Sequence, residues 1–347
     1  MTEMAGDSRA TGRWLAAWAV TLFLLFLVGG ATRLTQSGLS ITEWKPVTGV
    51  LPPLGEAAWQ EEFAKYQRIP QYARLNAAMQ LAQFKSIYLW EFVHRLWARV
   101  VGAVFAVPLL WFAARGAVRA SLRPRLFTLL LLMGAQGAMG WYMVKSGLTE
   151  RVNVSQYRLA AHLSLALVIY LVTVWTSASL LSPRPADRAD SGARVRSALG
   201  GLTVLAFGTV ISGAFVAGLR AGRIYNTFPT MAGRWVPAEY GSLAPWWRNL
   251  FENPSAAQFD HRLLALLTFV GALTAFVSLR RTARDTLLAR RMSLVLAAAV
   301  LQVGLGIATL LLAVPVALGV AHQAGAILLL TALLLALHAA PAAAHGG

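Results

Sequence analysis

Cysteine is absent from the 347 residues of this chain. Its absence excludes disulfide bonds, thiolate metal ligands and cysteine nucleophiles, so redox chemistry would have to come from a cofactor. Acidic residues are also scarce, with 14 Asp and Glu against 31 Lys and Arg, and charged residues make up only 13% of the chain. Hydrophobic residues reach 57%. These proportions are unlike those of a soluble domain and indicate a polytopic membrane protein.

The basic residues lie in short clusters between apolar runs of about 20 residues, the length that crosses a bilayer. We therefore interpret the net charge of +17 as a topology signal and expect no nucleic-acid partner. The polar N-terminus precedes the first run without a cleavage site, so we expect that span to be retained. Eight spans are predicted, at residues 14–32, 89–114, 125–145, 158–181, 199–220, 258–280, 291–313 and 317–338.

Three short connections between these spans are densely basic. The positive-inside rule places them in the cytoplasm, together with both termini, and a bacterial inner membrane is expected. The long first loop, about residues 33–88, then lies outside by parity. The basic residues are Arg115, Arg119, Arg123 and Arg125 in the first connection, Arg184, Arg188, Arg194 and Arg196 in the second, and Arg280, Arg281, Arg284, Arg290 and Arg291 in the third.

The two halves of the sequence resemble each other. "EFVHRLWARVVGAV" from Glu91 aligns with "QFDHRLLALLTFVGAL" from Gln258, and "AAHLSLALVIYL" from Ala160 aligns with "VAHQAGAILLLTALLLAL" from Val320. Two shorter matches agree with this alignment, namely residues 134–140 with 301–309 and residues 44–49 with 227–233.

Each half holds four spans, so both halves enter the membrane from the same side and the repeat is parallel. We expect an all-α integral membrane fold with eight transmembrane helices, arranged as two parallel-repeat four-helix bundles. The bundles are predicted to be residues 1–182 and 199–347. Residues 183–198, which carry Pro, Asp and Ser without hydrophobic periodicity, are predicted to be a cytoplasmic linker.

Four of the six histidines fall in the first two turns of even-numbered spans, which all begin at the outer face. Neutral imidazoles from two neighbouring helices can hold the iron of a planar macrocycle between them, so each half is predicted to bind haem. A lone histidine near a helix end is more often a structural residue, and the pairing by repeat is what favours ligands. The expected iron ligands are His94, His162, His261 and His322; His338 and His345 are not expected to be ligands.

The halves differ beside the first histidine of each pair. Glu91 precedes His94 by three residues and shares its helical face, whereas the aligned residue in the second half is Gln258, which has nearly the same shape but no charge. A carboxylate kept partly out of water needs a task or a partner. We therefore expect the first half to be reactive and the second to hold a cofactor. The alternatives are an anion favoured in the first turn of a helix or a salt bridge to Arg95.

Arginines follow the first histidine of each pair. Arg95 and Arg262 are predicted to bind haem propionates, with snorkelling to lipid headgroups as the alternative. Arg158, four residues before His162, aligns with a leucine in the second half and is a candidate for a role in the first half alone. Asp260 is interpreted as a cap or a contact to an outer loop. No role is predicted for Arg99.

Four motifs together resemble the haem A synthase family over nearly the whole chain. They are "GGATRLTQSGLSITEWKPVTGVLPP" at 29–53, "EFVHR" at 91–95, "NTFPTMAG" at 226–233 and "AHQ" at 321–323. The resemblance implies oxidation of a ring methyl of haem O to the formyl group of haem A for terminal oxidases. It also implies haem B on His261 and His322, a substrate site around His94 and His162, and a catalytic role for Glu91.

Some members of that family carry a cysteine pair in the first outer loop, so this chain resembles a cysteine-free branch. Haem O synthase and assembly factors of terminal oxidases are the protein partners that the resemblance implies. If both His94 and His162 stay on the substrate iron, no position remains for O₂. Either one histidine releases, or water attacks a carbocation-like methyl near Glu91, and we favour the second route on coordination grounds.

Three other functions remain compatible with parts of this pattern. A non-enzymatic bis-histidine dihaem cytochrome explains the four histidines but not the difference between Glu91 and Gln258. A transporter built on parallel repeats is expected to have polar groups at the bilayer midplane, whereas these lie near the outer ends. A structural subunit for oxidase assembly would have no need to bind haem.

Overall fold

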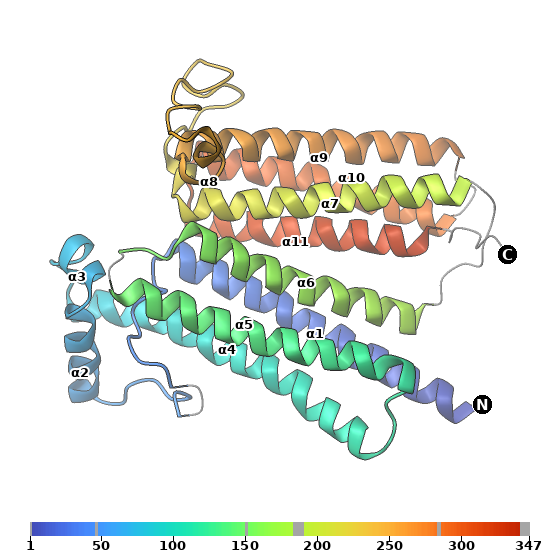
Figure 1. The fold of residues 1–347 in the computed structure, drawn as a ribbon, viewed down its shortest axis with the longest axis horizontal. Helices are drawn as coiled ribbons and strands as arrows, with labels where there is room; N and C mark the ends of the chain where they lie inside the picture. The colour runs from blue at the N-terminus through green and yellow to red at the C-terminus, as the bar shows by residue number, and fades with distance from the viewer. Residues whose placement is uncertain (1, 46–47, 150–151, 183–190, 283–285, 341–347) are drawn as a thin grey trace. The chain divides into compact units, whose positions relative to one another are not determined.

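The computed structural model describes residues 2–45, 48–149, 152–182, 191–282 and 286–340. Within these ranges eight helices are long and apolar enough to cross a membrane (Figure 1), which confirms the predicted fold class and number of spans. These long helices are α1 (Thr2–Leu34), α4 (Leu81–Ala114), α5 (Arg123–Thr149), α6 (Gln156–Leu181), α7 (Ser191–Gly218), α9 (Pro254–Thr282), α10 (Thr286–Leu311) and α11 (Val316–Ala339).

The remaining helices are short and lie in the connections. The first loop, for which no helix was predicted, contains α2 (Glu56–Gln67) and α3 (Pro70–Leu75). Single turns follow at η1 (Ala120–Leu122), η2 (Ala221–Arg223), η3 (Trp246–Arg248) and α8 (Asn249–Glu252). Of the predicted linker, residues 183–190 lie outside the described ranges, and residues 191–198 form the start of α7.

Helix α4 begins at Leu81, eight residues before the predicted start of its span. Gln80 and Gln83 form a capping box that starts the helix, with the Gln80 N–H donating to Gln83 Oε1 at 3.0 Å. His94 therefore lies thirteen residues into α4, and its predicted place in the first two turns is wrong. For the other three histidines that prediction is confirmed, because α6, α9 and α11 begin six or seven residues before them.

The helices group into two compact units. One unit comprises residues 20–169 and holds α2 to α5 with the C-terminal part of α1 and the N-terminal part of α6; the other comprises residues 1–19 and 170–347. In the second of these, α7 contacts α9, α9 contacts α10, α10 contacts α11 and α11 contacts α7, so the four helices close a ring. In the first, the hydroxyl of Thr32 on α1 donates to the Trp90 carbonyl on α4 at 3.2 Å.

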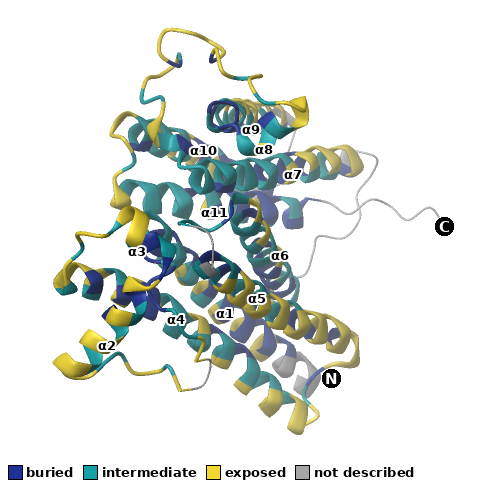
Figure 2. Ribbon diagram, turned by 60° about the vertical axis from the view of Figure 1, so that its left-hand side comes forward, coloured by how far each residue is buried: buried dark blue, intermediate teal, exposed yellow. Residues whose placement is uncertain are grey.

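An aromatic core fixes the first loop against the extended start of α4. Phe63 and Tyr66 of α2 pack on Phe84 with ring centroids 5.1 and 5.3 Å apart, and Leu39 and Ile41 complete the cluster. The inner faces of α2 and α3 are accordingly buried while their outer faces are exposed (Figure 2). Burial of this apolar surface explains why α4 continues beyond the apolar run that hydropathy detects.

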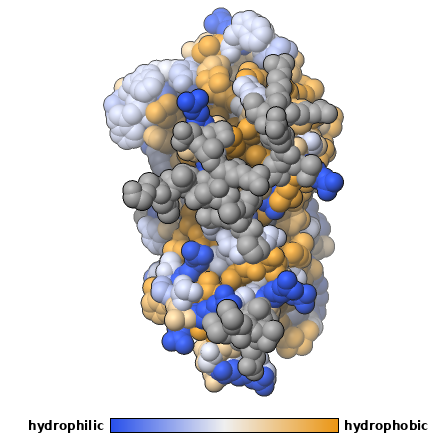
Figure 3. Space-filling view, turned by 90° about the vertical axis from the view of Figure 1, so that its right-hand side faces the viewer, coloured by the Kyte–Doolittle hydropathy of each residue, from blue (hydrophilic) through white to orange (hydrophobic). Residues whose placement is uncertain are grey.

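The long helices keep large apolar side chains on their exposed sides. Leu110 of α4 is 69% exposed and Val204 of α7 is 71% exposed. Sides of this kind are stable against lipid, where the helix satisfies its own backbone polar groups. At the end of the helices that Figure 3 views, hydrophilic residues lie among the apolar ones.

Candidate functional site

The rings of His261 on α9 and His322 on α11 lie close to each other. Their ring centroids are 6.3 Å apart and their planes make an angle of 88°. A metal–imidazole bond is about 2 Å long and the ring centre lies roughly 1 Å behind the ligating nitrogen, so two imidazoles on opposite sides of one metal have centroids about 6 Å apart. The observed separation fits a single iron between the rings.

A neighbouring side chain lies within hydrogen-bond distance of Nδ1 in each histidine of this pair. The Ser212 hydroxyl lies 2.8 Å from His261 Nδ1, and the Gln302 amide nitrogen lies 3.1 Å from His322 Nδ1. A partner that accepts from Nδ1–H fixes the orientation of a ligating histidine and leaves Nε2 for the metal. The Ser212 hydroxyl can accept in this way, and the Gln302 amide does so when it presents its oxygen to His322. The donor set in this unit therefore fits a bis-histidine haem.

The other predicted pair comes from α4 and α6 and differs in its hydrogen bonds. The amide nitrogen of Gln136 lies 3.2 Å from His162 Nε2 and donates to the His162 carbonyl at 3.1 Å. His162 Nδ1 is buried and has no hydrogen-bond partner among the described residues. Here the amide contacts Nε2 and leaves Nδ1 orphaned, the reverse of the arrangement at His322.

Each of the four histidines packs against a glycine of another long helix, which is α1, α5, α7 or α10. A Cβ added at any of these glycines would approach the imidazole closely, so the missing side chain makes room for the ring. The closest distances are 3.2 Å from Gly29 to His94, 3.4 Å from Gly140 to His162, 3.1 Å from Gly213 to His261 and 2.9 Å from Gly306 to His322.

Glu91 is buried and fully hydrogen-bonded. Its Oε2 accepts from the Ser40 N–H at 2.7 Å, the Ser40 hydroxyl at 2.7 Å and the Ile41 N–H at 2.9 Å. Its Oε1 pairs with Arg95 Nη2 at 2.6 Å, with Arg95 Nε at 3.1 Å. The alternative of an anion in the first helical turn is wrong, because Glu91 lies ten residues into α4. The alternative of a salt bridge to Arg95 is observed.

Arg95 also binds the backbone of the first loop, donating to the carbonyls of Glu43 at 2.8 Å and Ile41 at 2.9 Å. The second unit repeats this contact. Arg262 donates to the carbonyls of Tyr225 at 2.9 Å and Thr227 at 3.0 Å. The registers agree, since 225 − 41 and 227 − 43 both give 184. Each arginine thus holds the loop that precedes its helix.

Gln258, the counterpart of Glu91, makes a weaker contact with its loop. Its amide nitrogen donates to the Tyr225 carbonyl at 3.2 Å, and its Oε1 is buried without a hydrogen-bond partner in the described part of the chain. The Nε of Arg262 is likewise buried and unpartnered there. The predicted difference between the halves is therefore present in the contacts as well as in the sequence.

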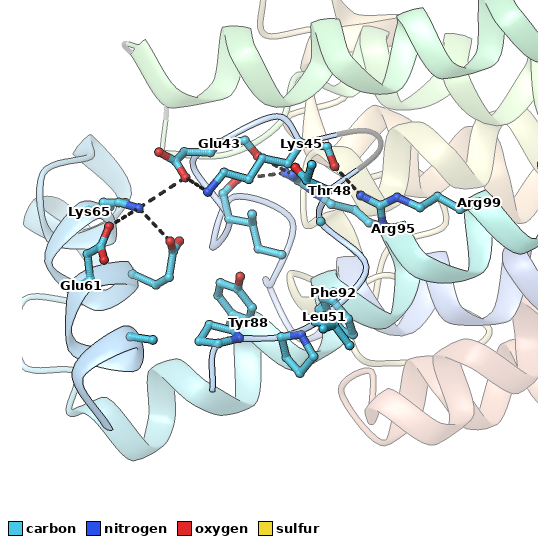
Figure 4. Close-up of a pocket in the computed structure, with 16 residues that line it drawn as sticks. Glu43, Lys45, Thr48, Leu51, Glu61, Lys65, Tyr88, Phe92, Arg95 and Arg99 are labelled. Carbon is cyan, nitrogen blue, oxygen red and sulfur yellow. Dashed lines mark hydrogen bonds and ion pairs between the residues drawn. The ribbon is translucent and has the colours of Figure 1, made fainter. Parts of the chain in front are cut away.

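A charged pocket of about 260 Å³ lies between the first loop, α2 and α4 (Figure 4). Lys65 of α2 pairs in it with Glu43, Glu61 and Glu62 at 3.3, 2.8 and 2.8 Å. Hydrogen bonds to Glu61 and Glu62 raise the pKa of Lys65, while the hydrogen bond from Lys45 lowers the pKa of Glu43. Arg99, which had no predicted role, donates to the Lys45 carbonyl at 2.7 Å.

The structure also places the remaining residues that the sequence analysis discussed. Arg158 donates to the Ser146 hydroxyl and to the Tyr142 hydroxyl, the latter at 3.3 Å. Asp260 accepts from the Tyr240 hydroxyl at 2.9 Å, so of its two interpretations the contact with a loop is observed. His338 is buried beside Trp175, with ring centroids 5.2 Å apart. His345 lies outside the described residues.

Comparison with known proteins places this arrangement in a family. A family model described as cytochrome oxidase assembly protein, COX15-CtaA, matches residues 12–334, from α1 to α11. The chain belongs to this family. Members of COX15-CtaA similar to it include the heme A synthase of Rhodospirillum centenum, 48% identical over 334 residues that cover 96% of this chain and 89% of the relative. The heme A synthase of Bradyrhizobium sp. strain BTAi1 is 50% identical over 328 residues, covering 94% and 90%.

Several contacts of this COX15-CtaA chain were not predicted. Ser212, Gln136 and Gln302 were not singled out, although the two glutamines occupy equivalent places in the matched segments 134–140 and 301–309. The polar residues of α2 were not predicted to meet those of the first loop. The structure does bring together His261 with His322 and Glu91 with Arg95.

Proposed function

We propose that this chain is a haem A synthase, an oxidoreductase that converts the ring methyl of haem O to the formyl group of haem A in the bacterial inner membrane. Relatives of that name, about half identical over most of the chain, support the activity. The observation that carries the proposal is the His261–His322 pair, whose 6.3 Å separation fits an axially ligated iron in a family that serves cytochrome oxidase assembly.

The second half, residues 199–347, holds haem B on His261 and His322. Bound there, haem B supplies one-electron transfer. Ser212 and Gln302 orient the two imidazoles from Nδ1, and Arg262, whose buried Nε has no protein partner among the described residues, binds a propionate. Arg95 takes the equivalent position in the first half, where a propionate shares it with the loop carbonyls. The two halves are parallel repeats joined at residues 183–198.

The first half, residues 1–182, holds haem O as the substrate between His94 and His162. Glu91 acts there as a catalytic carboxylate, and its bonds to Arg95, Ser40 and Ile41 hold it in place. With both histidines on the substrate iron, water supplies the formyl oxygen and Glu91 stabilises positive charge at the methyl carbon or accepts its proton. The oxidation of the methyl to the formyl group by water releases four electrons and four protons, and the electrons leave through haem B to an external one-electron acceptor. Label in the formyl group that comes from O₂ rather than from water would contradict this route.

In this proposal both termini lie in the cytoplasm and the two haem sites lie toward the outer face, which the basic connections support through the positive-inside rule. Haem O is supplied by a haem O synthase, and the product passes to assembly factors of terminal oxidases.

Haem extraction tests the proposal. The full-length protein and its Glu91→Gln variant are expressed with a source of haem O, purified, and their haems are separated by chromatography. We expect haem B and haem A in the parent, and haem B without haem A in the variant. Gln258→Glu is the matched control and keeps haem A formation. Haem B alone in all three proteins would favour the electron-transfer cytochrome instead.

A further inference from the structure

The two histidine pairs present their ligating nitrogens differently. We infer that the His261–His322 site is locked for permanent haem binding, whereas the His94–His162 site is built for exchange, with Gln136 as the positioning residue that makes it so. The inference rests on the proposed function, because it concerns how a substrate haem enters and a product haem leaves.

The orientation of the Gln136 amide is fixed by a second contact. Its nitrogen donates to the His162 carbonyl at 3.1 Å, and a carbonyl oxygen can only accept, so the NH₂ group must lie on this side. The same nitrogen lies 3.2 Å from His162 Nε2. One N–H of Gln136 therefore points at the carbonyl and the other at the lone pair of Nε2. That lone pair cannot bind iron until the hydrogen bond is broken.

Gln302 is equivalent by position, since 302 − 136 and 306 − 140 both give 166, but it has a different effect. Gln136 and Gln302 both have a buried Oε1 without a hydrogen-bond partner among the described residues. Gln136 is held by its contact with the His162 carbonyl, whereas the Gln302 amide contacts His322 through Nδ1, at 3.1 Å. The amide can turn by half a rotation in the same space and present Oε1 to an Nδ1–H. In that state Nε2 keeps its lone pair for iron, so Gln302 supports coordination where Gln136 competes with it.

His94 adds a second difference between the pairs. A Cβ built on Gly29 would lie nearest to Nε2 of His94, at 3.2 Å, so this nitrogen faces the backbone of α1. At the other three histidines the atom nearest the glycine is Cε1. His94 must turn about its Cβ–Cγ bond before Nε2 leaves the α1 backbone. Both imidazoles of the first half therefore change their contacts on binding iron, whereas in the second half the imidazoles keep their places and the Gln302 amide turns.

The difference matches what each haem has to do. A resident haem B is best held by imidazoles that are already oriented, because no rearrangement opposes binding. A substrate haem must also be released after oxidation, and the Gln136 hydrogen bond lowers the barrier to release because it replaces the lost iron bond. A hydrogen bond of ordinary net strength changes an equilibrium by roughly 3- to 10-fold.

The test compares Gln136→Met with Gln302→Met in the full-length purified protein. Methionine keeps the length of glutamine but cannot donate or accept a strong hydrogen bond. Both halves are loaded with ferric haem B as the probe, and transfer to excess apomyoglobin is followed by absorbance. The parent should release haem in two phases, fast from the first half and slow from the second. We expect Gln136→Met to slow the fast phase roughly 3- to 10-fold and Gln302→Met to accelerate the slow phase.

Opposite effects of two matched substitutions cannot come from a general loss of stability. An unchanged or accelerated fast phase in Gln136→Met, with the variant still folded, would overturn the inference. If Gln136→Met does not fold, Gln136→Leu is read in the same way. Haem A formation in the parent is measured in parallel. A parent that forms haem A while Gln136→Met leaves release unchanged refutes only the exchange mechanism, and a parent that forms none refutes the proposed function.

Discussion

The glycine beside each histidine gives a graded prediction. An alanine at position 306 places Cβ 2.9 Å from Cε1 of His322, closer than packed carbons come, so the ring has to move. Gly304 lies on the same helix with nothing within 4 Å of its added Cβ. The two substitutions share the gain in helix propensity, up to about 1 kcal/mol, and differ in the clash.

Overpacking of a well-packed site costs about 1–3 kcal/mol, so Gly306→Ala should be less stable than Gly304→Ala by roughly that amount. Gly213→Ala places its Cβ 3.1 Å from His261 and should lose less folding stability. Its control is Gly208→Ala, whose Cβ meets nothing within 4 Å. Displacement of a ligating ring should also weaken the low-spin bis-histidine signal of the bound haem.

Thermal unfolding of the purified proteins and the absorbance of retained haem B are the two assays. The order of haem loss should be Gly306→Ala, then Gly213→Ala, with the two control variants equal to the parent. If Gly306→Ala matched Gly304→Ala in both unfolding temperature and haem content, the glycine would not be what makes room for His322. The reasoning from the 2.9 Å contact would then be refuted.

Three further predictions concern the first loop. Glu91→Gln removes the charged partner of Arg95. Breaking a buried ion pair costs about 3–5 kcal/mol of folding stability; because Arg95 keeps two carbonyl partners, we expect a loss of about 2–3 kcal/mol and faster proteolysis of residues 36–53. An unchanged cleavage rate would mean that Glu91 does not hold the loop and acts in the chemistry alone. Gly147→Ala brings Cβ within 2.7 Å of Leu39 Cδ2 and should also loosen the loop, by about 1–3 kcal/mol, whereas Gly134→Ala on the same helix should not. Because the pKa of Glu43 is lowered and that of Lys65 is raised, the ion cluster stabilises α2 above the ordinary Glu value of 4.5 and below the ordinary Lys value of 10.5, and its contribution is lost outside that window. A spin label on Ala64→Cys, which introduces the only thiol in the chain, should become mobile as the pH falls below this window. If the same acid response persisted in a Lys65→Met background, the ion cluster around Lys65 would not be its cause.

The sequence predicts the number of long helices because lipid imposes a length and an apolar composition that hydropathy measures directly. It does not predict where α4 begins. Residues 81–88 are too polar for a span, yet they are helical because Gln80 caps them and because Phe84 packs on Phe63 and Tyr66 of α2. Those contacts join segments that are about 20 residues apart and leave no periodic signal.

Part of the candidate site can likewise be predicted from the sequence, and part cannot. The repeat of "HR" in both halves predicts the histidines and arginines, since matched positions in a duplication are visible in one sequence. The partners of Glu91 are not visible, because Ser40 and Ile41 lie about 50 residues before it in a loop without regular structure. Ser212, Gln136 and Gln302 depend on how each helix is rotated about its axis, which an apolar helix in lipid does not reveal from its pattern alone.

The contacts of Arg95 and Arg262 have a consequence for how the two halves could diverge. Both guanidinium groups bind main-chain carbonyls, of Ile41 and Glu43 in one half and of Tyr225 and Thr227 in the other. A carbonyl is the same in every residue, so these contacts depend on the path of the loop and not on its side chains. The loop of each half was therefore free to change its side chains while its main chain stayed over the helix.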